Sequence, residues 1–306
     1  MKKLLTILIL LSSLTVLGQK DALYYQYMFN PFILNPAYAG VPQVLNLHVV
    51  DRYQWIGIPG APKTLTVSGH FPLRNQKVGL GGYLYSDNYG PIMDYGFMGN
   101  YSYRVNFWEG KLSFGIQAGV VKRWINWDVI DMPDLDDVYL MTRPQPGISP
   151  DVNFGVLYYE EDFFIGLSTK HLLEITFNDI VIKGNKSFSA LQRHLYLYHG
   201  WMLPINNRLL FKPEILLKYV LAEDVYFDLN AFLLINKTIW VGASYRHHTR
   251  SVVFLTELNI NRKLKVGYSW DTYLGDVWDY NIGTHEFMLS YTLNIYKVWQ
   301  RHPLYF

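Results

Sequence analysis

Residues 94–105, DYGFMGNYSYRV, decide the fold class of this 306-residue chain, because the character of their side chains alternates at every position. One set is Tyr95, Phe97, Gly99, Tyr101, Tyr103 and Val105, and the other is Asp94, Gly96, Met98, Asn100, Ser102 and Arg104. Successive side chains of a β-strand point to opposite faces, so a period of two residues predicts a strand with one apolar and one polar face. Its length is close to the roughly 9 to 11 residues that a tilted strand needs to cross a bilayer.

The same alternation recurs along the chain after residue 43, in segments separated by turn residues. We count about fourteen such segments, an even number as in most single-chain bacterial barrels. They lie near residues 44–54, 63–72, 77–87, 92–105, 110–126, 150–159, 162–171, 191–203, 208–221, 224–235, 237–248, 250–260, 262–273 and 284–297. The sequence therefore predicts an all-β fold, a transmembrane antiparallel β-barrel of about 14 strands.

The connections between these segments alternate in length. Short ones are expected at residues 74–76, 108–110, 160–162, 205–207 and 235–236, and long ones at residues 127–149, 172–190 and 274–283. Short turns are typical of the periplasmic rim of such a barrel, and long loops are typical of the outer rim. Because an even number of strands returns the chain to its starting side, we expect both mature termini to be periplasmic.

Composition agrees with a strand-built membrane protein. Charged residues make up 17% of the chain, below the roughly 25% of soluble domains, and aromatic residues also make up 17%. The mean hydropathy of +0.02 is far below that of helical membrane proteins, and no apolar run after residue 75 approaches the 18 to 20 or so residues of a spanning helix. A net charge of +2 without a long basic run argues against nucleic-acid binding. The absence of cysteine excludes disulfides, a lipoprotein anchor and thiolate metal sites.

The first residues have the features of a cleavable secretory leader. Lys2 and Lys3 precede a short apolar core, residues 4–11, which is too short for a transmembrane anchor. We therefore expect a signal peptide at residues 1–18, an N-terminal periplasmic segment at residues 19–43 and a barrel at residues 44–306. Such a protein would be integral to the outer membrane of a Gram-negative bacterium.

Residues 24–64, YYQYMFNPFILNPAYAGVPQVLNLHVVDRYQWIGIPGAPKT, begin with a segment that cannot be an ordinary strand. Pro31 and Pro36 fix their φ angles and remove two backbone donors, so residues 26–40 cannot add a fully bonded strand to a barrel wall. The segment is also too apolar for an aqueous tail, and its buried place could be the lumen or a partner protein. We expect it to form an ordered lid or docking segment at the periplasmic mouth.

The same stretch carries spaced motifs. They are Gln26-Tyr27-Met28-x-Asn30-Pro31, Asn35-Pro36-Ala37-Tyr38-Ala39-Gly40, Arg52-x-Gln54-Trp55-x-Gly57 and Gly60-Ala61-Pro62-x-Thr64. This pattern resembles the PorP/SprF family of type IX secretion membrane proteins, and the rest of the chain matches more loosely through Asp87-x-x-Gly90 and its glycine-rich strands. The resemblance implies an outer-membrane barrel that helps deliver large adhesins or proteases to the cell surface.

Partner contacts are the site prediction that follows from this resemblance. The expected partners are the lipid bilayer, a secreted cargo protein or its C-terminal domain, and components of the type IX translocon. The partner-binding candidates are Gln26, Tyr27, Met28, Asn30, Pro31, Asn35, Pro36, Ala37, Tyr38, Ala39, Gly40, Arg52, Gln54, Trp55 and Gly57. The alternative for the pairs Gln54-Trp55 and Tyr24-Tyr25 is that they are aromatic residues at the membrane interface.

Chemistry-bearing motifs are sparse. Asp128, Asp131, Asp134, Asp136 and Asp137 could bind Ca²⁺, but their spacing fits no EF-hand and we favour a solvated acidic loop. His247 and His248 are adjacent on an expected strand and so point to opposite faces. No catalytic motif, cofactor site or metal site is predicted, although a spatial Ser-His triad would be hidden from the sequence.

Two functions follow from these observations. The first is an outer-membrane barrel that supports type IX secretion by recognising or presenting a large, adhesin-like surface protein. The alternative is an outer-membrane channel for hydrophobic small molecules, with residues 19–43 as an N-terminal plug. We favour the first, because a plug usually needs more residues than these to fill a lumen.

Overall fold

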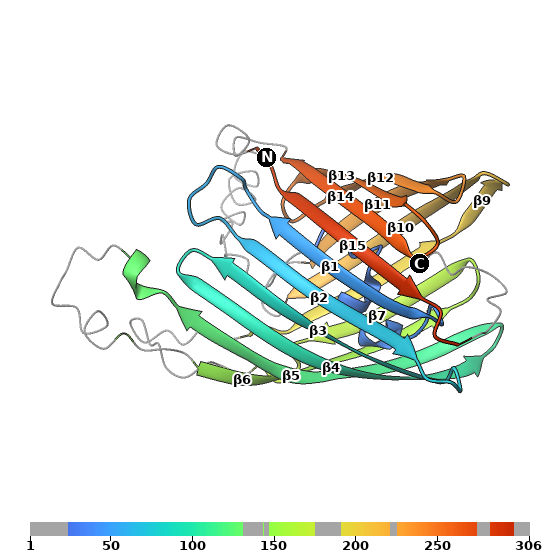
Figure 1. Cartoon of the computed structure of the whole chain (residues 1–306), viewed down its shortest axis with the longest axis horizontal. Helices are drawn as coiled ribbons and strands as arrows, with labels where there is room; N and C mark the ends of the chain where they lie inside the picture. The colour runs from blue at the N-terminus through green and yellow to red at the C-terminus, as the bar shows by residue number, and fades with distance from the viewer. Residues whose placement is uncertain are drawn as a thin grey trace, which may run out of the picture.

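The structure is a computed structural model that describes residues 24–130, 143, 147–174, 191–220, 225–273 and 282–296. Its described residues form one antiparallel sheet that closes into a barrel (Figure 1). The strands are β1 (Leu45–Tyr53), β2 (Lys63–Pro72), β3 (Val78–Tyr89), β4 (Ile92–Phe107), β5 (Gly110–Ile125), β6 (Gly147–Tyr159), β7 (Phe163–Lys170), β8 (His194–Trp201), β9 (Leu203–Asn206), β10 (Leu209–Val220), β11 (Val225–Ile235), β12 (Ile239–Arg246), β13 (Ser251–Asn259), β14 (Leu264–Tyr273) and β15 (His285–Leu293). Three 3-10 turns accompany them in the described part of the chain: η1 (Pro31–Ile33), η2 (Pro36–Tyr38) and η3 (Trp127–Val129).

Each strand pairs with its neighbours in sequence, and β15 closes the barrel on β1. Both β8 and β9 pair with β10, and Met202 alone separates them, so together they form one strand of the wall. The wall therefore has fourteen strands, and the predicted fold class is confirmed. Among the described residues there is no helix long and apolar enough to cross a membrane.

All fourteen predicted segments coincide with strands, with small differences at their ends. β6 begins at Gly147, three residues earlier than expected, because Gly147 pairs with Arg123 of the long strand β5. β15 ends at Leu293, earlier than the expected residue 297, because Leu293 lies opposite Leu45, the first residue of its partner β1.

The two faces of the wall follow the predicted alternation. On β4, Phe97 is 55% exposed on the outer face, whereas Asn100 and Arg104 are buried on the inner face. The last strand behaves in the same way, with Leu289 outside and Glu286 and Ser290 inside. Polar side chains inside and apolar side chains outside are the arrangement of a barrel surrounded by lipid.

The two rims differ in the length of their connections. The connections at residues 73–77, 108–109, 160–162, 207–208, 236–238 and 260–263 all lie at one rim, which we call the short-turn rim. The opposite rim, called the long-connection rim, includes residues 54–62 between β1 and β2. Asp128 lies at this rim and forms an ion pair with Arg143, at 2.7 Å; the rest of the acidic cluster, residues 131–137, is outside the described residues.

A lipid-facing charge should destabilise the barrel in proportion to its depth. Leu289 is the fifth of the nine residues of β15 and is 47% exposed, so Leu289→Arg should lower the free energy of unfolding by about 2 to 4 kcal/mol. Leu258→Arg, next to the short-turn end of β13, should cost about 0 to 1 kcal/mol. Urea unfolding in lipid vesicles measures both; equal stability of the two variants would contradict the assigned depth of β15.

Candidate functional site

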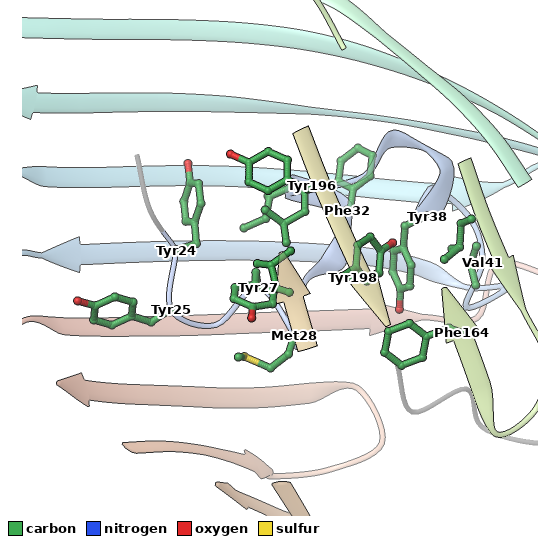
Figure 2. Close-up of a cluster of buried hydrophobic side chains, with 14 of the residues drawn as sticks. Tyr24, Tyr25, Tyr27, Met28, Phe32, Tyr38, Val41, Phe164, Tyr196 and Tyr198 are labelled. Carbon is green, nitrogen blue, oxygen red and sulfur yellow. The ribbon is translucent and has the colours of Figure 1, made fainter. Parts of the chain in front are cut away.

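The N-terminal segment lies inside the barrel. Residues 24–43, which we call the plug, begin beside the long-connection ends of β2 and β14, where Tyr24 hydrogen-bonds Thr66 and Tyr25 donates to Asp271. They end at the short-turn rim, where the Gly40 amide donates to His70 near the end of β2. Figure 2 shows this course, with Tyr24 and Tyr25 at one end of the cluster and Val41 at the other.

This position corrects two expectations. Residues 26–40 are ordered, as predicted, but they lie within the lumen and not as a lid at the mouth, and nearly all of them are buried. The argument that so few residues could not act as a plug is also wrong. Large wall side chains, including Tyr83, Tyr196, Tyr198 and Trp240, reach inward to pack against the plug, so it does not have to fill the lumen alone. The expected leader and residues 19–23 lie outside the described residues.

The two Asn-Pro pairs explain the compact path of the plug. Pro31 and Pro36 each occupy the first position of a 3-10 turn, where a missing amide donor has no cost. Asn35 accepts a hydrogen bond from the Ala37 amide at 2.8 Å, which closes the start of η2. The side-chain amide of Asn35 also donates to the carbonyls of Val156 and Leu167, at 3.0 and 3.3 Å. One side chain thus shapes the plug and fastens it to β6 and β7.

The first part of the plug is held by buried charges. The backbone amides of Tyr25 and Gln26 each donate to the Glu286 carboxylate at 2.8 Å. Two guanidinium groups lie close to the Tyr25 ring, those of Arg52 at 4.6 Å and Arg246 at 4.7 Å from its centroid. Cations close to an aromatic face are attracted by its quadrupole, most strongly when desolvated. We call Tyr25, Arg52, Arg246 and Glu286 the tyrosine clamp.

Two carboxylates pair with the cations around this clamp. Arg52 lies 3.6 Å from Glu286, and Arg246 pairs with Asp228 at 3.0 Å. Lys218 pairs with the same Asp228 carboxylate at 2.6 Å. Because these groups are buried, loss of one partner leaves an uncompensated charge, which is strongly destabilising.

The second part of the plug is held through its carbonyl groups. Wall hydroxyl, amide and guanidinium groups donate to the carbonyls of Leu34, Pro36, Ala37 and Ala39; the donors are Ser168, Asn100, Ser113, Ser102 and Arg104. A segment without strand pairing must satisfy its buried polar groups in this way. The inward polar residues of β4, β5 and β7 therefore act as a template for the plug.

Inward glycines give the plug room to approach the wall. Gly115 of β5 and Gly155 of β6 are paired across the two strands. A Cβ at Gly115 would lie 2.2 Å from the Ala37 amide nitrogen, and one at Gly155 would lie 2.0 Å from the Asn35 side chain. Both distances are far below van der Waals contact, so any larger residue here would displace the plug.

The remaining candidates lie elsewhere. Arg52 belongs to the tyrosine clamp, but Gln54, Trp55 and Gly57 lie in the β1–β2 connection at the long-connection rim. Gln54 is buried, Trp55 is partly exposed and Gly57 is exposed. This connection is tied to the β14–β15 connection, since the Ile56 amide donates to the Gly283 carbonyl at 3.0 Å. The structure thus brings Arg52 together with residues 26–40 and leaves the other three at the rim.

Sequence reasoning missed the wall residues of the site. Glu286, Asp228, Arg246 and Lys212 bind the plug or its partners from β15, β11, β12 and β10. Their signal was present in the alternation, because each is a charged residue at an inward position of a strand. A charge at such a position is hard to bury without a specific partner.

Metal sites are not a feature of the described residues, among which no group of three or more His, Asp or Glu side chains is suitably placed. His247 stacks on Phe227 with ring centroids 4.6 Å apart, and His248 contacts Tyr226. Burial lowers the pKa of the His248 imidazole below its usual range, and the nearby Lys218 ammonium lowers it further.

A known protein family matches this chain along most of its length. A family described as type IX secretion system membrane protein PorP/SprF matches residues 16–291, which include the plug and nearly the whole wall. The chain belongs to the PorP/SprF family. This PorP/SprF protein is therefore a barrel of the outer membrane associated with type IX secretion, and the resemblance found in residues 24–64 is confirmed. Its family is one of secretion-system membrane proteins and not a family of enzymes.

Solved structures resemble the PorP/SprF barrel in fold alone. The TodX deltaS2S3 mutant, a monoaromatic hydrocarbon channel, has 10% sequence identity and a TM-score of 0.52, over 89% of this chain and 95% of that one. The outer membrane protein Omp33 of Acinetobacter baumannii has 11% identity and a TM-score of 0.48, over 83% and 99% of the two chains. A sequence search against curated proteins gives no match.

Proposed function

We propose that this PorP/SprF barrel supports type IX secretion by recognising a large secreted surface protein, or its C-terminal domain, and presenting it at the cell surface. The observation that carries the proposal is the family match across plug and wall together. In this proposal the short-turn rim faces the periplasm and the long-connection rim faces outward, as the lengths of the connections favour. Translocon components are the expected neighbours in the membrane.

The burial of the candidates divides their roles in this proposal. Trp55 and Gly57 are accessible at the long-connection rim and are the candidates for direct contact with cargo. The buried candidates, from Gln26 to Gly40, act by fixing the plug and with it the shape of the rims. A rigid rim surface is enough for recognising cargo, because recognition needs preorganised groups and no covalent chemistry.

The direct test is a deletion of the gene followed by complementation. In cells without the barrel, large adhesin-like proteins should stay inside the cell or detach from it, so that they are missing from the surface. The wild-type gene should restore their display. Surface proteomics of intact cells provides the measurement. Normal display of every such protein in the deletion strain would exclude the proposal.

The alternative, a channel for hydrophobic small molecules, is favoured by the plug in the lumen and by the likeness to the TodX fold. The chemistry of the lumen argues against it. Arg52, Arg246, Lys212 and Glu286 are buried beside the plug, and an apolar solute would have to pass these charges. Uptake of a hydrocarbon by vesicles that contain the barrel, at a rate above that of empty vesicles, would favour the channel.

The plug can be weakened without touching the rims. Replacing Asn35 and Pro36 together by alanine removes two wall hydrogen bonds and the closure of η2, at a cost of roughly 1 to 3 kcal/mol for the buried groups left unsatisfied. We expect less cargo display with unchanged insertion of the barrel. Immunoblots of outer membranes and of surface-exposed cargo measure the two effects. Normal display, together with a protease-resistant plug, would contradict the prediction.

A further inference from the structure

The plug does not fill the lumen completely, and a hollow remains between the plug and one side of the wall, at the short-turn rim. This hollow, which we call the short-turn recess, has a volume of about 590 Å³. It lies between the plug and the wall formed by β12–β15 and β1, and its mouth is formed by the short turns after β11 and β13. Its volume is within the range of roughly 300 to 1,000 Å³ that is typical of ligand sites.

The recess has an apolar side, formed largely by the plug, and a polar side on the wall that carries Asn46, His48, Ser290 and Thr292. Met28, Phe29 and Tyr38 of the plug line it, together with Trp240 of β12. The Phe29 and Trp240 rings are 6.4 Å apart and tilted to each other. Aromatic and thioether side chains of this kind accommodate an apolar side chain of a ligand.

The mouth of the recess is basic. Lys237 and Arg262 are exposed in the two short turns, and Lys265 is 40% exposed beside them. Among the described residues, one carboxylate lines the recess, that of Glu257, which is buried and pairs with Lys265 at 3.4 Å. Three cations therefore face one carboxylate, and the charge complements an anionic ligand.

A second hollow makes the site elongated. It has a volume of about 580 Å³ and lies at the same rim, lined by residues of β9 and β10, by the cations Arg208 and Lys237, and by the carboxylates of Glu161 and Asp162 in the β6–β7 turn. The charges of this second hollow balance, so selectivity for acidic groups belongs to the short-turn recess. Lys237 lines both hollows. A binding surface that extends from β1 and β15 past Lys237 to β9 suits an extended chain better than a compact molecule.

We infer that the short-turn recess binds an acidic, extended polypeptide segment, with carboxylates at Lys237 and Arg262 and an apolar side chain against Phe29. The inference rests on the proposed function for the source of this segment, a secreted protein that reaches the barrel from the short-turn side. Because its apolar part rests on Met28, Phe29 and Tyr38, the segment would contact the plug directly.

The test uses the full-length barrel in detergent and three fluorescent eight-residue peptides. One is rich in Asp and Glu with one Phe, the second replaces Phe by Ser, and the third replaces the acids by Lys. The first should bind most tightly and the third should not bind. Lys237→Glu with Arg262→Glu should weaken the first peptide at least tenfold, and Arg74→Glu with Lys77→Glu, at the same rim but outside both hollows, should change it less than twofold.

Several results would overturn the inference. Equal binding of the acidic and basic peptides, or equal affinities of the two double variants, would show that the recess does not select acidic chains. Complete displacement of the first peptide by phosphatidylglycerol micelles at lower concentration would assign the recess to an anionic lipid. Normal cargo display in cells that lack the gene would exclude the proposed function but not peptide binding at the recess. Loss of display in those cells, together with no binding of the acidic peptide to the purified barrel, would exclude the recess inference but not the proposed function.

Discussion

Deletion of residues 24–40 is expected to convert the barrel into an ion-conducting pore. The deleted residues cross the lumen, and the wall side chains that hold them are polar or charged, among them Arg246, Lys212 and Glu286. Such groups hydrate readily once the plug is gone. A fourteen-stranded wall is intermediate between eight-stranded barrels, which side chains fill, and barrels of 16 to 18 strands, which hold an aqueous channel.

Single-channel recording in planar bilayers measures this effect. The wild-type barrel should give few or no current steps, and the deletion variant should give long-lived ones. Gly155→Leu should give intermittent steps, because its side chain would occupy the place of Asn35. Gly99→Leu is the matched control, since the nearest atom to its Cβ is 3.8 Å away. A deletion variant as silent as the wild type would mean that the wall alone closes the lumen.

The wall could be predicted from the sequence because its signal is local. The alternation from Asp94 to Val105 indicates the two faces of β4 directly, and the same two-residue period identified all the remaining strands of the wall. The number of strands followed from the number of such segments. Strand ends could not be predicted in this way, because they depend on the neighbouring strand: Leu293 pairs with Leu45, the first residue of β1, and β1 offers no partner to the residues after Leu293.

The site could be predicted only in part because its contacts are distant in sequence. The prolines showed that residues 26–40 are not a strand, and their apolar side chains showed that they must be buried. Whether this segment is buried in the lumen or against a partner protein depends on residues such as Glu286 and Arg246, which follow Tyr25 by 261 and 221 positions. No local pattern links such residues.

Two inward glycines were a sequence signal of the contact between plug and wall. Glycine inside a strand marks a bulge, a bend or a place where another backbone approaches closely. Gly115 and Gly155 mark such a close approach, because they lie opposite each other on β5 and β6 and directly against the plug. A pair of inward glycines on adjacent strands predicts a close approach from inside the lumen, and the Asn35-Pro36 turn makes that approach.

Replacing Glu286 by alanine should release the first part of the plug. Its carboxylate accepts the amides of Tyr25 and Gln26 and lies 3.6 Å from the Arg52 guanidinium. Alanine would leave two buried amides without an acceptor and a buried cation without its partner. Breaking a buried pair by removing one side costs about 3 to 5 kcal/mol, so the released state should become about a hundred-fold to several thousand-fold more populated.

Chymotrypsin added to membranes measures this release, because it cleaves after Tyr24, Tyr25 and Tyr27 only when they leave the lumen. Glu286→Ala should be cleaved rapidly, whereas Glu109→Ala, which removes an exposed turn carboxylate at the short-turn rim, should resist cleavage as the wild type does. Glu286→Gln should be intermediate, since its amide oxygen can still accept a backbone amide but carries no charge for Arg52. Because the strand pairing of β15 uses only backbone groups, the barrel should remain folded in all three variants. A Glu286→Ala barrel that unfolds with its plug still protected would show that the carboxylate stabilises the wall and not the plug.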